Sequence, residues 1–213
     1  MKDIPIFTTQ NGVASLKLKE IPYTKSAYIQ IQDSLSPELF LEECIGFCKA
    51  VGAEQIFATG HAYLHTWKKH AEIWQLSLNC AAIADTDASL MPITEQTLSQ
   101  WRLIYNEKMA DVACFSYMTQ SDANALLKKG GGYFIHKGGT LLGIGMASGN
   151  RIDAVVSVVK GSGETLIRAL VHAISSDVVT LEVASTNEKA LRLYNKMGFI
   201  RTQCLRTWYV YQK

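Results

Sequence analysis

Two stretches of the sequence each place a strand pattern, a helix pattern and a second strand pattern in that order. The first is SAYIQIQDSLSPELFLEECIGFCKAVGAEQIFATG, and the second is DAVVSVVKGSGETLIRALVHAISSDVVTLEVAS. Written one above the other, they match Ala27 with Ala154 and Leu39 with Leu166. A strand–helix–strand unit joins two parallel strands through a crossover helix. The sequence therefore predicts an α/β fold that contains a duplicated strand–helix–strand unit.

The C-terminal part gives the clearer pattern. PITEQTLSQWRLIYNEKM predicts a helix that opens with Pro92 and has Thr94 as its candidate N-cap, and a second short helical region ends at Gly130 to Gly132. Two strands joined by a Lys-Gly-Gly hairpin, the strand IDAVVSVV, a helix, the strand VVTLEVA, another helix and a last strand follow. The helix from KGSGE is expected to bury Leu166, Ala169, Leu170 and Ala173. This order predicts a mixed, twisted sheet flanked by helices, in a domain over residues 91–213.

The N-terminal part has fewer clear signals. GVASLKL, SAYIQIQ, EQIFATG and EIWQLSL have strand patterns, and SPELFLEECIGFCKAVG has a helix pattern with Ser36 as N-cap and Pro37 at the first helical position. Where the C-terminal copy has KGSGE, this copy has DSLSP, without glycine. We therefore expect residues 1–90 to form a structural half-domain, of strand-strand-helix-strand order, that extends the sheet.

Composition excludes several classes of function. With 48% hydrophobic and 19% charged residues the chain is an ordinary globular one, and a net charge of +2 gives no field that would favour nucleic acid or an anionic membrane. No apolar run approaches a bilayer span, so a soluble, cytoplasmic protein is expected. The five cysteines form no CxxC pair and are expected to be reduced, with Cys44 and Cys48 sharing one helix face in the core.

The turn KGSGE lies between a buried strand and a helix N-terminus. Gly161 and Gly163 would let an anion approach the free N–H groups of the helix, and Lys160 would add a charge. The two glycines could equally serve turn geometry alone. The turn is not a Walker A loop, and a dinucleotide-binding fingerprint would need a third glycine where the chain has Leu166.

The stretch LEVASTNEKALRLYNKMGFI also permits two interpretations. Glu182 points to the opposite face from its neighbours in a strand that reads as buried, which is costly unless the carboxylate is solvated or paired. Ser185 and Glu188 have the spacing of a capping box, and Tyr194 lies on the apolar stripe of the helix that follows. Periodicity alone does not separate a structural segment from part of an active site.

The same stretch resembles a conserved block of the GCN5-related N-acetyltransferase (GNAT) superfamily, whose pattern is L-x-V-x-x-x-N-x-x-A-x-x-L-Y-x-x-x-G-F. Every marked position agrees: Leu181, Val183, Asn187, Ala190, Leu193, Tyr194, Gly198 and Phe199. The resemblance in element order extends over residues 91–213, and residues 1–90 look like a partial copy of the same fold.

The resemblance implies that IDAVVSVV and the next strand splay apart to form a slot for acetyl-coenzyme A. The thioester would lie against the backbone of Val156 to Val158, with Ser157 not assigned a role, and Asn187 would orient the pantetheine arm. The pyrophosphate would bind the turn formed by Lys160, Gly161, Ser162, Gly163, Glu164 and Thr165. The chain departs from the family in one place, because Val158 stands where the phosphate loop usually has Gln or Arg. The loss of a polar side chain there bears on the affinity for the cofactor and not on its location.

The resemblance also implies a mechanism. A primary amine would attack the thioester directly, Tyr194 would protonate the leaving thiolate, and Glu182 or ordered water would accept the proton of the amine. A raised pKa would suit Glu182 to that task. The alternative is a catalytically silent relative that binds coenzyme A or serves as a scaffold. The acceptor, a small molecule or a peptide, is not predicted, and a homodimer is possible.

The segment HAYLHTWKKHAEIW contains three histidines within ten residues, His61, His65 and His70. A metal site would need further ligands, so a packing or lid segment is the favoured interpretation and no metal is expected.

Overall fold

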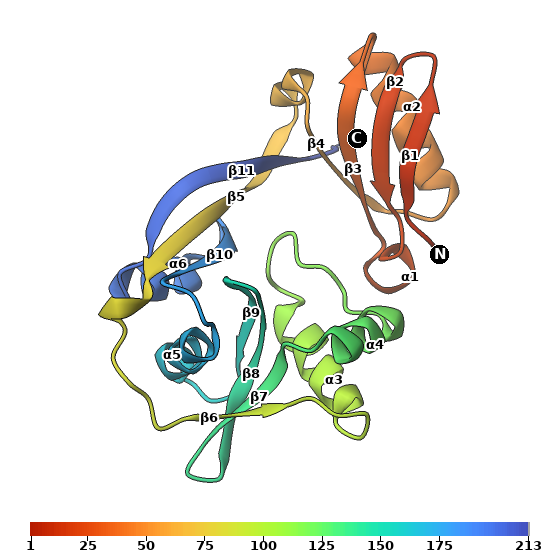
Figure 1. Cartoon of the computed structure of the whole chain (residues 1–213). Helices are drawn as coiled ribbons and strands as arrows, with labels where there is room; N and C mark the ends of the chain where they lie inside the picture. Colours follow the sequence, from red (N-terminus) through yellow and green to blue (C-terminus); the bar gives the residue numbers. More distant parts are fainter. Residues whose placement is uncertain (213) are drawn as a thin grey trace. The chain divides into compact units, whose positions relative to one another are not determined.

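The computed structural model describes residues 1–212, which pack as two compact units (Figure 1). Unit 1 comprises Met1–Ile73 and the chain from Cys204 onward, and unit 2 comprises Trp74–Gln203. Two long strands, β5 (Lys68–Asn79) and β11 (Ile200–Val210), each contribute residues to both units. The predicted boundary at residue 90 therefore falls inside unit 2, and the end of the chain packs with the beginning.

Unit 1 is a sheet with one long helix. Its strands stand in the order β1-β2-β3-β4-β11, where the β3–β4 pair is parallel and the other pairs are antiparallel. The remaining elements are β1 (Ile4–Thr9), β2 (Gly12–Lys17), a one-turn α1 (Ile21–Thr24), β3 (Ser26–Ser34), α2 (Pro37–Ala50), β4 (Gln55–Thr59) and a 3-10 helix (Ala62–Thr66). Ser36 and Pro37 begin α2 as predicted, whereas β1 was not predicted.

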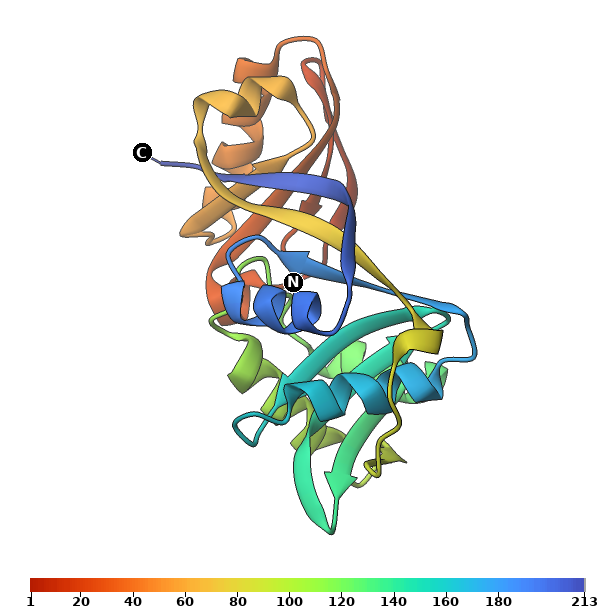
Figure 2. The same cartoon turned by 90° about the vertical axis from the view of Figure 1, so that its left-hand side faces the viewer.

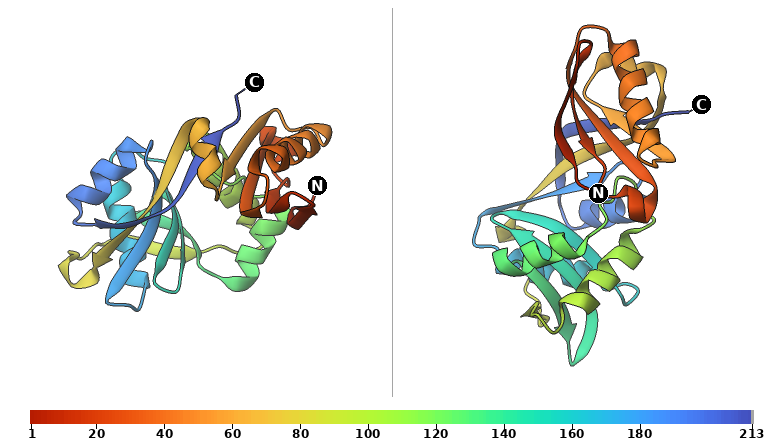
Figure 3. Two further views of the ribbon diagram at one scale, coloured as in Figure 1. Left: turned by 90° about the horizontal axis from the view of Figure 1, so that it is seen from above. Right: turned by 90° about the vertical axis from the view of Figure 1, so that its right-hand side faces the viewer.

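Helix α2 covers one face of this sheet (Figure 3). Its buried side chains include Phe40, Cys44 and Cys48, which pack with Leu16 and Ile29 of the strands. The i, i+4 spacing of the two cysteines places both in the core, as predicted, and both thiols are free.

Unit 2 is a mixed sheet with helices on both faces. Its strand order is β11-β5-β10-β9-β8-β7-β6, antiparallel from β6 to β9 and parallel between β9 and β10. In chain order its elements after β5 are a short 3-10 helix (Cys80–Ala82), β6 (Ser89–Pro92), α3 (Leu98–Met109), α4 (Gln120–Lys129), β7 (Gly132–Lys137), β8 (Thr140–Ser148), β9 (Arg151–Ser157), α5 (Gly163–Ala173), β10 (Val178–Ala184) and α6 (Glu188–Lys196).

Helices cover both faces of this sheet (Figures 1 and 2), and each face has its own core. On one face Trp101 of α3 and its neighbours pack against Ala154 and Val156. On the other face Leu166 and Leu170 of α5 lie in a cluster with strand residues of the sheet, and α6 joins this cluster through partly buried side chains. Strand β9 is thus covered on both faces, which is what its nearly continuous apolar sequence predicts.

Helix α5 approaches β8 closely because two glycines face it. A Cβ atom at Gly143 would lie 2.7 Å from Leu166 Cδ1, and one at Gly145 would lie 2.6 Å from Leu170 Cδ1. Both separations are far shorter than a normal carbon–carbon contact of about 3.5–4.0 Å. The glycines in LLGIGMA therefore set the spacing between this layer and the sheet.

Three predictions about α3 and α5 were wrong. Pro92 does not open a helix; it is the last residue of β6 and pairs with Tyr133. The N-cap of α3 is Thr97, not Thr94, because the Thr97 hydroxyl accepts the Thr94 N–H and closes a turn before the helix. Ala173, the last residue of α5, is exposed, and Val171 belongs to the buried set instead.

Candidate functional site

Strands β9 and β10 part soon after they meet. In the described part of the chain, only Thr180 with Arg151 and Leu181 with Ile152 are paired between them. On its other edge, β9 is paired with β8 along its whole length, but the register changes where Met146 faces Ala154 and Ala147 faces Ile152.

That register change leaves Asp153 as one extra residue in β9. Such a β-bulge bends the strand that carries it and increases its local twist. The bulge follows immediately after the last pair with β10, so the bend accounts for the separation of the strands. Beyond Ile152, the edge of β9 that faces β10 presents backbone groups without a strand partner in the described chain.

The turn that follows β9 is tied to β8. The backbone N–H groups of Val158 and Val159 both donate to the Leu142 carbonyl, at 2.9 and 3.2 Å. The buried Ser162 hydroxyl donates to the carbonyls of Val159 and Leu142, at 2.7 and 3.1 Å. These bonds hold the turn in a fixed place at the end of β9 and satisfy the Ser162 hydroxyl without a ligand.

Each glycine of the turn has a structural reason. Gly161 has φ of +86°, a conformation that side chains other than glycine rarely adopt. A Cβ atom at Gly163 would lie 2.7 Å from Leu193 Cδ2 of α6. The second contact also shows that the start of α5 lies against α6, one residue away from Tyr194.

Helix α5 begins at Gly163, so the N–H groups of Gly163, Glu164 and Thr165 are in its first turn, where no intrahelical acceptor exists. The helix dipole adds positive potential at the same place. The chain therefore presents backbone donors to an anion directly after the open edge of β9.

A carboxylate and two cations surround this turn. Glu164 accepts from Lys196 Nζ at 2.7 Å and from Arg168 Nη2 at 2.6 Å, and these bonds lower the pKa of its carboxyl group. Lys196 belongs to α6, so the ion pair is a second link between α6 and the turn. Lys160 is exposed beside it.

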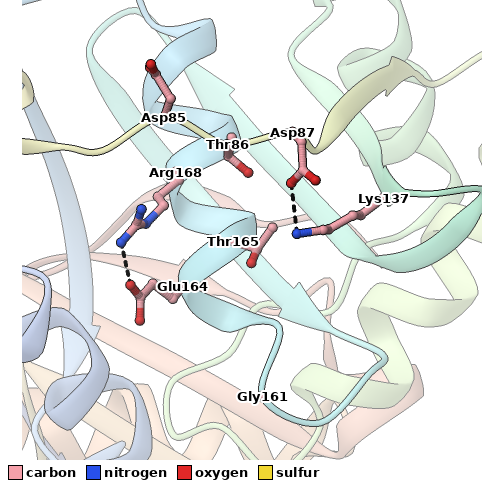
Figure 4. A pocket seen from close by; sticks show the side chains of 8 residues that line it. All are labelled: Asp85, Thr86, Asp87, Lys137, Gly161, Glu164, Thr165 and Arg168. Atoms are coloured by element: carbon pink, nitrogen blue, oxygen red, sulfur yellow. Dashed lines mark hydrogen bonds and ion pairs between the residues drawn. The ribbon is translucent and has the colours of Figure 1, made fainter.

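A cavity of about 680 Å³ opens beside the turn (Figure 4). It is bounded by the N-terminal turn of α5, the loop ahead of β6 and the end of β7, where Lys137 Nζ lies 2.9 Å from Asp87 Oδ1. Its lining residues are Asp85, Thr86, Asp87, Lys137, Gly161, Glu164, Thr165 and Arg168.

Tyr194 packs on α6 with its ring 5.5 Å from that of Phe199, measured between centroids. Burial raises the pKa of Tyr194 to about 12, so its phenol keeps its proton at neutral pH. Among the described residues its hydroxyl has no hydrogen-bond partner, which leaves the O–H group available as a donor.

Asn187, not Ser185, is the N-cap of α6. Its Oδ1 accepts the Ala190 N–H at 3.2 Å, and the helix begins at Glu188. The predicted capping box of Ser185 and Glu188 was therefore wrong, because the chain turns into the helix two residues later. Capping occupies the Asn187 carbonyl and leaves its amide nitrogen for another acceptor.

Glu182 lies at the point where the strands part. It is exposed, and its Oε1 is 3.6 Å from Arg151 Nη1. Arg151 Nε also donates to Asp153 Oδ1 at 2.5 Å, and Asp153 accepts from Ser148 Oγ at 2.7 Å. The carboxylate is thus exposed and paired with a guanidinium, the two conditions under which the sequence permitted a charge in this strand.

No protein-family model matches the sequence, and no curated protein is significantly similar to it. Solved structures are similar over nearly the whole chain. A functionally unknown conserved protein from Staphylococcus epidermidis has a TM-score of 0.60 at 10% identity, covering 96% of this chain and 91% of its own. An acetyltransferase described as putative, from Pyrococcus horikoshii, has a TM-score of 0.57 at 12% identity, covering 95% and 70%.

A tandem GNAT protein from the clavulanic acid biosynthesis pathway has a TM-score of 0.52 at 11% identity, covering 94% of this chain and 78% of its own. Further neighbours are described as GCN5-related N-acetyltransferases. The chain has the GNAT fold.

Within this GNAT fold, the structure brings most of the predicted site residues to one end of β9. Val156 and Val158 precede the turn, residues 160–165 form it, and Tyr194 is held next to it by Leu193 and Lys196. Asn187 and Glu182 are at the start of α6 and in β10. No ligand tests the roles predicted for them, and these roles stay predictions.

Sequence reasoning missed the charged residues around this part of the GNAT fold. Arg151, Asp153 and Lys196 had no motif to mark them, because an ion pair between strands or between helices has no fixed spacing in the sequence. The bulge at Asp153 likewise has no glycine or proline to mark it.

Metal ligands and membrane-spanning helices are separate from this part of the fold. Within residues 1–212, no three His, Cys, Asp or Glu side chains gather as metal ligands would. None of the helices described combines the length and the apolar character of a bilayer span.

Proposed function

We propose that unit 2 binds acetyl-coenzyme A between β9 and β10 and transfers the acetyl group to a primary amine. One observation supports this proposal most directly: the unpaired edge of β9 leads straight into the turn and the free N–H groups of α5. A long ligand with an amide-bearing arm and a pyrophosphate needs these two features in this order.

In the proposed complex, the arm is held by those backbone groups of Val156 to Val158 that are not bonded to β8. The pyrophosphate lies on residues 160–165, where the dipole of α5 and Lys160 offset its charge. Asn187 donates its amide N–H to the arm while its carbonyl caps α6.

The transfer step forms a bond between the amine nitrogen and the acetyl carbon and breaks the carbon–sulfur bond. Tyr194 donates its phenolic proton to the leaving sulfur, a role for which the phenol must carry its proton at neutral pH, as burial ensures, and for which its hydroxyl is unoccupied. The proton lost by the ammonium goes to Glu182, directly or through water, and the phenol regains a proton from solvent.

A second candidate is a silent relative that binds coenzyme A without turnover. Val158 favours it, because this position has no polar side chain and its N–H is bonded to Leu142. The Glu164 carboxylate beside the phosphate turn also favours it, although Arg168 and Lys196 offset that charge.

Calorimetric titration with acetyl-coenzyme A tests the site first. Thr165→Glu places a carboxylate in the first turn of α5, where it suits the helix and repels a phosphate. Gln120→Glu makes the same kind of change in the first turn of α4 and serves as the matched control. Binding that is lost with Thr165→Glu and kept with Gln120→Glu supports the proposal. No binding by the unchanged protein contradicts both candidates.

Tyr194→Phe then separates the two candidates. In an acetyltransferase, we expect kcat to fall roughly 10²–10⁴-fold with acetyl-coenzyme A affinity unchanged, since the phenyl ring keeps its packing but has no proton to donate. The assay is mass spectrometry of acetylated products from a panel of peptides, polyamines, aminoglycosides and amino acids. Binding without any product from the unchanged protein would favour the silent relative.

A further inference from the structure

A second cavity, of about 610 Å³, lies entirely within unit 1. It is formed where β3, β4 and β11 meet the 3-10 helix that follows β4. Its lining residues are Gln30, Thr59, Gly60, His61, Ala62, His65, Leu205, Arg206, Thr207 and Tyr209. Its volume is within the range of about 300–1,000 Å³ that is usual for small-molecule sites.

The position of this cavity in the unit is the one where parallel α/β sheets bind ligands. Gln30 and Thr59 form the last pair of the parallel strands β3 and β4. Ligands of open α/β sheets lie beyond the carboxyl ends of such strands.

The wall of the cavity is fixed by the chain immediately after β4. Gly60 has φ of +100°, and a Cβ atom there would be 2.2 Å from the Ile31 carbonyl oxygen. Only glycine allows this approach, so the chain is held tightly against β3 before it turns into the 3-10 helix. Thr59, which is buried, donates from Oγ1 to the Thr207 carbonyl at 2.7 Å and joins β11 to this wall.

The charged side chains of the lining are basic, and Tyr209 is its remaining ionisable residue. Arg206, His61 and His65 are among its ten residues, and no aspartate or glutamate is. His61 Nδ1 accepts the Tyr63 N–H at 3.1 Å, so the proton of a neutral His61 ring is on Nε2, the nitrogen that can donate to a ligand. The His65 ring is 5.6 Å from the ring of Tyr209, which restricts its orientation.

These donors fit an anion. A guanidinium binds a carboxylate or a phosphate through two parallel hydrogen bonds, and imidazole and amide N–H groups add further donors. We propose that unit 1 has its own ligand site, in which Arg206, His61 and His65 bind a small molecule through its carboxylate or phosphate group.

This site would differ in kind from the slot of unit 2. Strands β3 and β4 stay paired over five consecutive residues to the end of β4, and Gly60 then lies against Ile31, so the early parting of β9 and β10 is not repeated here. The connection from β3 to α2 also has no glycine to admit a pyrophosphate. A compact anion, and not a second coenzyme A, is therefore the expected ligand.

The test uses the full chain labelled with ¹⁵N at histidine, titrated separately with inorganic phosphate and with malonate. The imidazole resonances are assigned from His61→Gln and His65→Gln. We expect one of the two anions, or both, to shift the His61 and His65 resonances while those of His136 and His172 in unit 2 stay in place. The anion that acts at lower concentration identifies the class of ligand.

Arg206→Gln should weaken the anion that binds by roughly tenfold or more, because a charge-assisted pair is lost. Arg192→Gln removes the same charge from an exposed position in unit 2 and should leave the affinity within about twofold. The proposal is overturned if neither anion shifts His61 and His65 at concentrations up to about 20 mM, well beyond a millimolar Kd. It is equally overturned if both arginine variants bind alike.

Discussion

Position 143 is a glycine, and because it has no Cβ atom helix α5 can lie close to its sheet. A Cβ atom there would meet the Val156 carbonyl oxygen at 2.2 Å as well as Leu166. Val156 belongs to β9, whose other edge forms the proposed slot. A side chain at position 143 that pushed on Val156 would therefore also move that edge.

Gly143→Ala should therefore destabilise the protein by about 1–3 kcal/mol, because backbone and side chain must both move to admit the methyl group. The measurement is urea unfolding of the full chain. Gly46→Ala is the control, since position 46 is in the middle of α2. Apart from the backbone of its own helix, no atom lies within 4 Å of the place that a Cβ atom would take. Alanine there should stabilise the protein by about 0.5–1 kcal/mol. Equal effects of the two variants would contradict the packing argument.

The cysteines should differ widely in reactivity. Burial raises the pKa of Cys44 to about 12, with Cys48 and Glu43 adding to the shift, and burial raises that of Cys48 to about 11. A raised pKa means less thiolate at any pH below it, and thiolate is the reactive form. Between pH 7 and 9, we expect a thiol reagent to label the exposed Cys204 first and to reach the α2 pair only on unfolding.

Mass spectrometry of labelled peptides gives the order of reaction. Raising the pH from 7 to 9 should speed the labelling of Cys204 while the two buried cysteines stay protected. If Cys44 or Cys48 reacts as fast as Cys204 in the folded protein, helix α2 is not packed as described.

At the scale of elements, the bulge in β9 is the feature on which the proposed slot depends. Deletion of Asp153 would leave Ile152 and Ala154 facing consecutive residues of β8, as in a regular ladder. Strand β9 should then straighten and continue its pairing with β10. We expect this variant to fold and to bind acetyl-coenzyme A at least tenfold more weakly by calorimetry. The reason is that β10 would then form hydrogen bonds with the β9 backbone groups that the ligand needs.

Asp153→Asn is the matched control for that deletion. It changes the charge and keeps the extra residue, so binding should stay within about threefold of that of the unchanged chain. If both variants lose the same binding affinity, the effect belongs to the carboxylate and not to the bulge. If the deletion loses no affinity, ligand binding does not depend on the bulge.

Most of the elements in unit 2 could be predicted from the sequence, because their patterns are strong. The hairpin at Gly138 and Gly139, the parallel strands β9 and β10, and the helix between them are all confirmed. The exact helix starts were not predicted, since several Thr, Ser and Asn residues near each start can all act as caps. Asn187 caps α6 in place of Ser185 because of the path that the chain takes into the helix. A local sequence pattern does not specify that path.

The candidate site was predictable in its backbone and less so in its electrostatics. Gly161, Gly163 and Tyr194 are marked by a motif, and the structure places them around one turn. The partners of Glu182 and Glu164 come from other elements, and their approach depends on how β10 and α6 pack. The bulge at Asp153 depends on the pairing with β8 and is invisible in a single strand.

At the scale of the whole molecule, the division of the chain differs from a simple cut between two halves. The last part of β11 pairs with β4, Tyr209 with Ala58 and Val210 with Phe57, inside unit 1. Trp208 lies against the ring of Tyr28 in the same unit.

Removal of the chain from Cys204 onward should therefore destabilise unit 1 and leave unit 2 comparatively intact. Hydrogen exchange followed by mass spectrometry can report on each unit separately. We expect faster exchange in β3 and β4 and little change in α5 and β8. Uniformly faster exchange in both units would show that they unfold together. Unchanged exchange in β4 would contradict the pairing with β11.

The path of β11 also has a consequence for the order in which the protein can form during translation. Every residue of unit 2 leaves the ribosome before Cys204 does, although unit 1 contains the N-terminus. Domains generally complete in the order of synthesis. Here the strands of unit 1 that precede unit 2 must wait, with the edge of β4 uncovered, until the strand that follows unit 2 arrives. The nascent chain thus finishes its proposed catalytic unit while the unit begun before it is still incomplete.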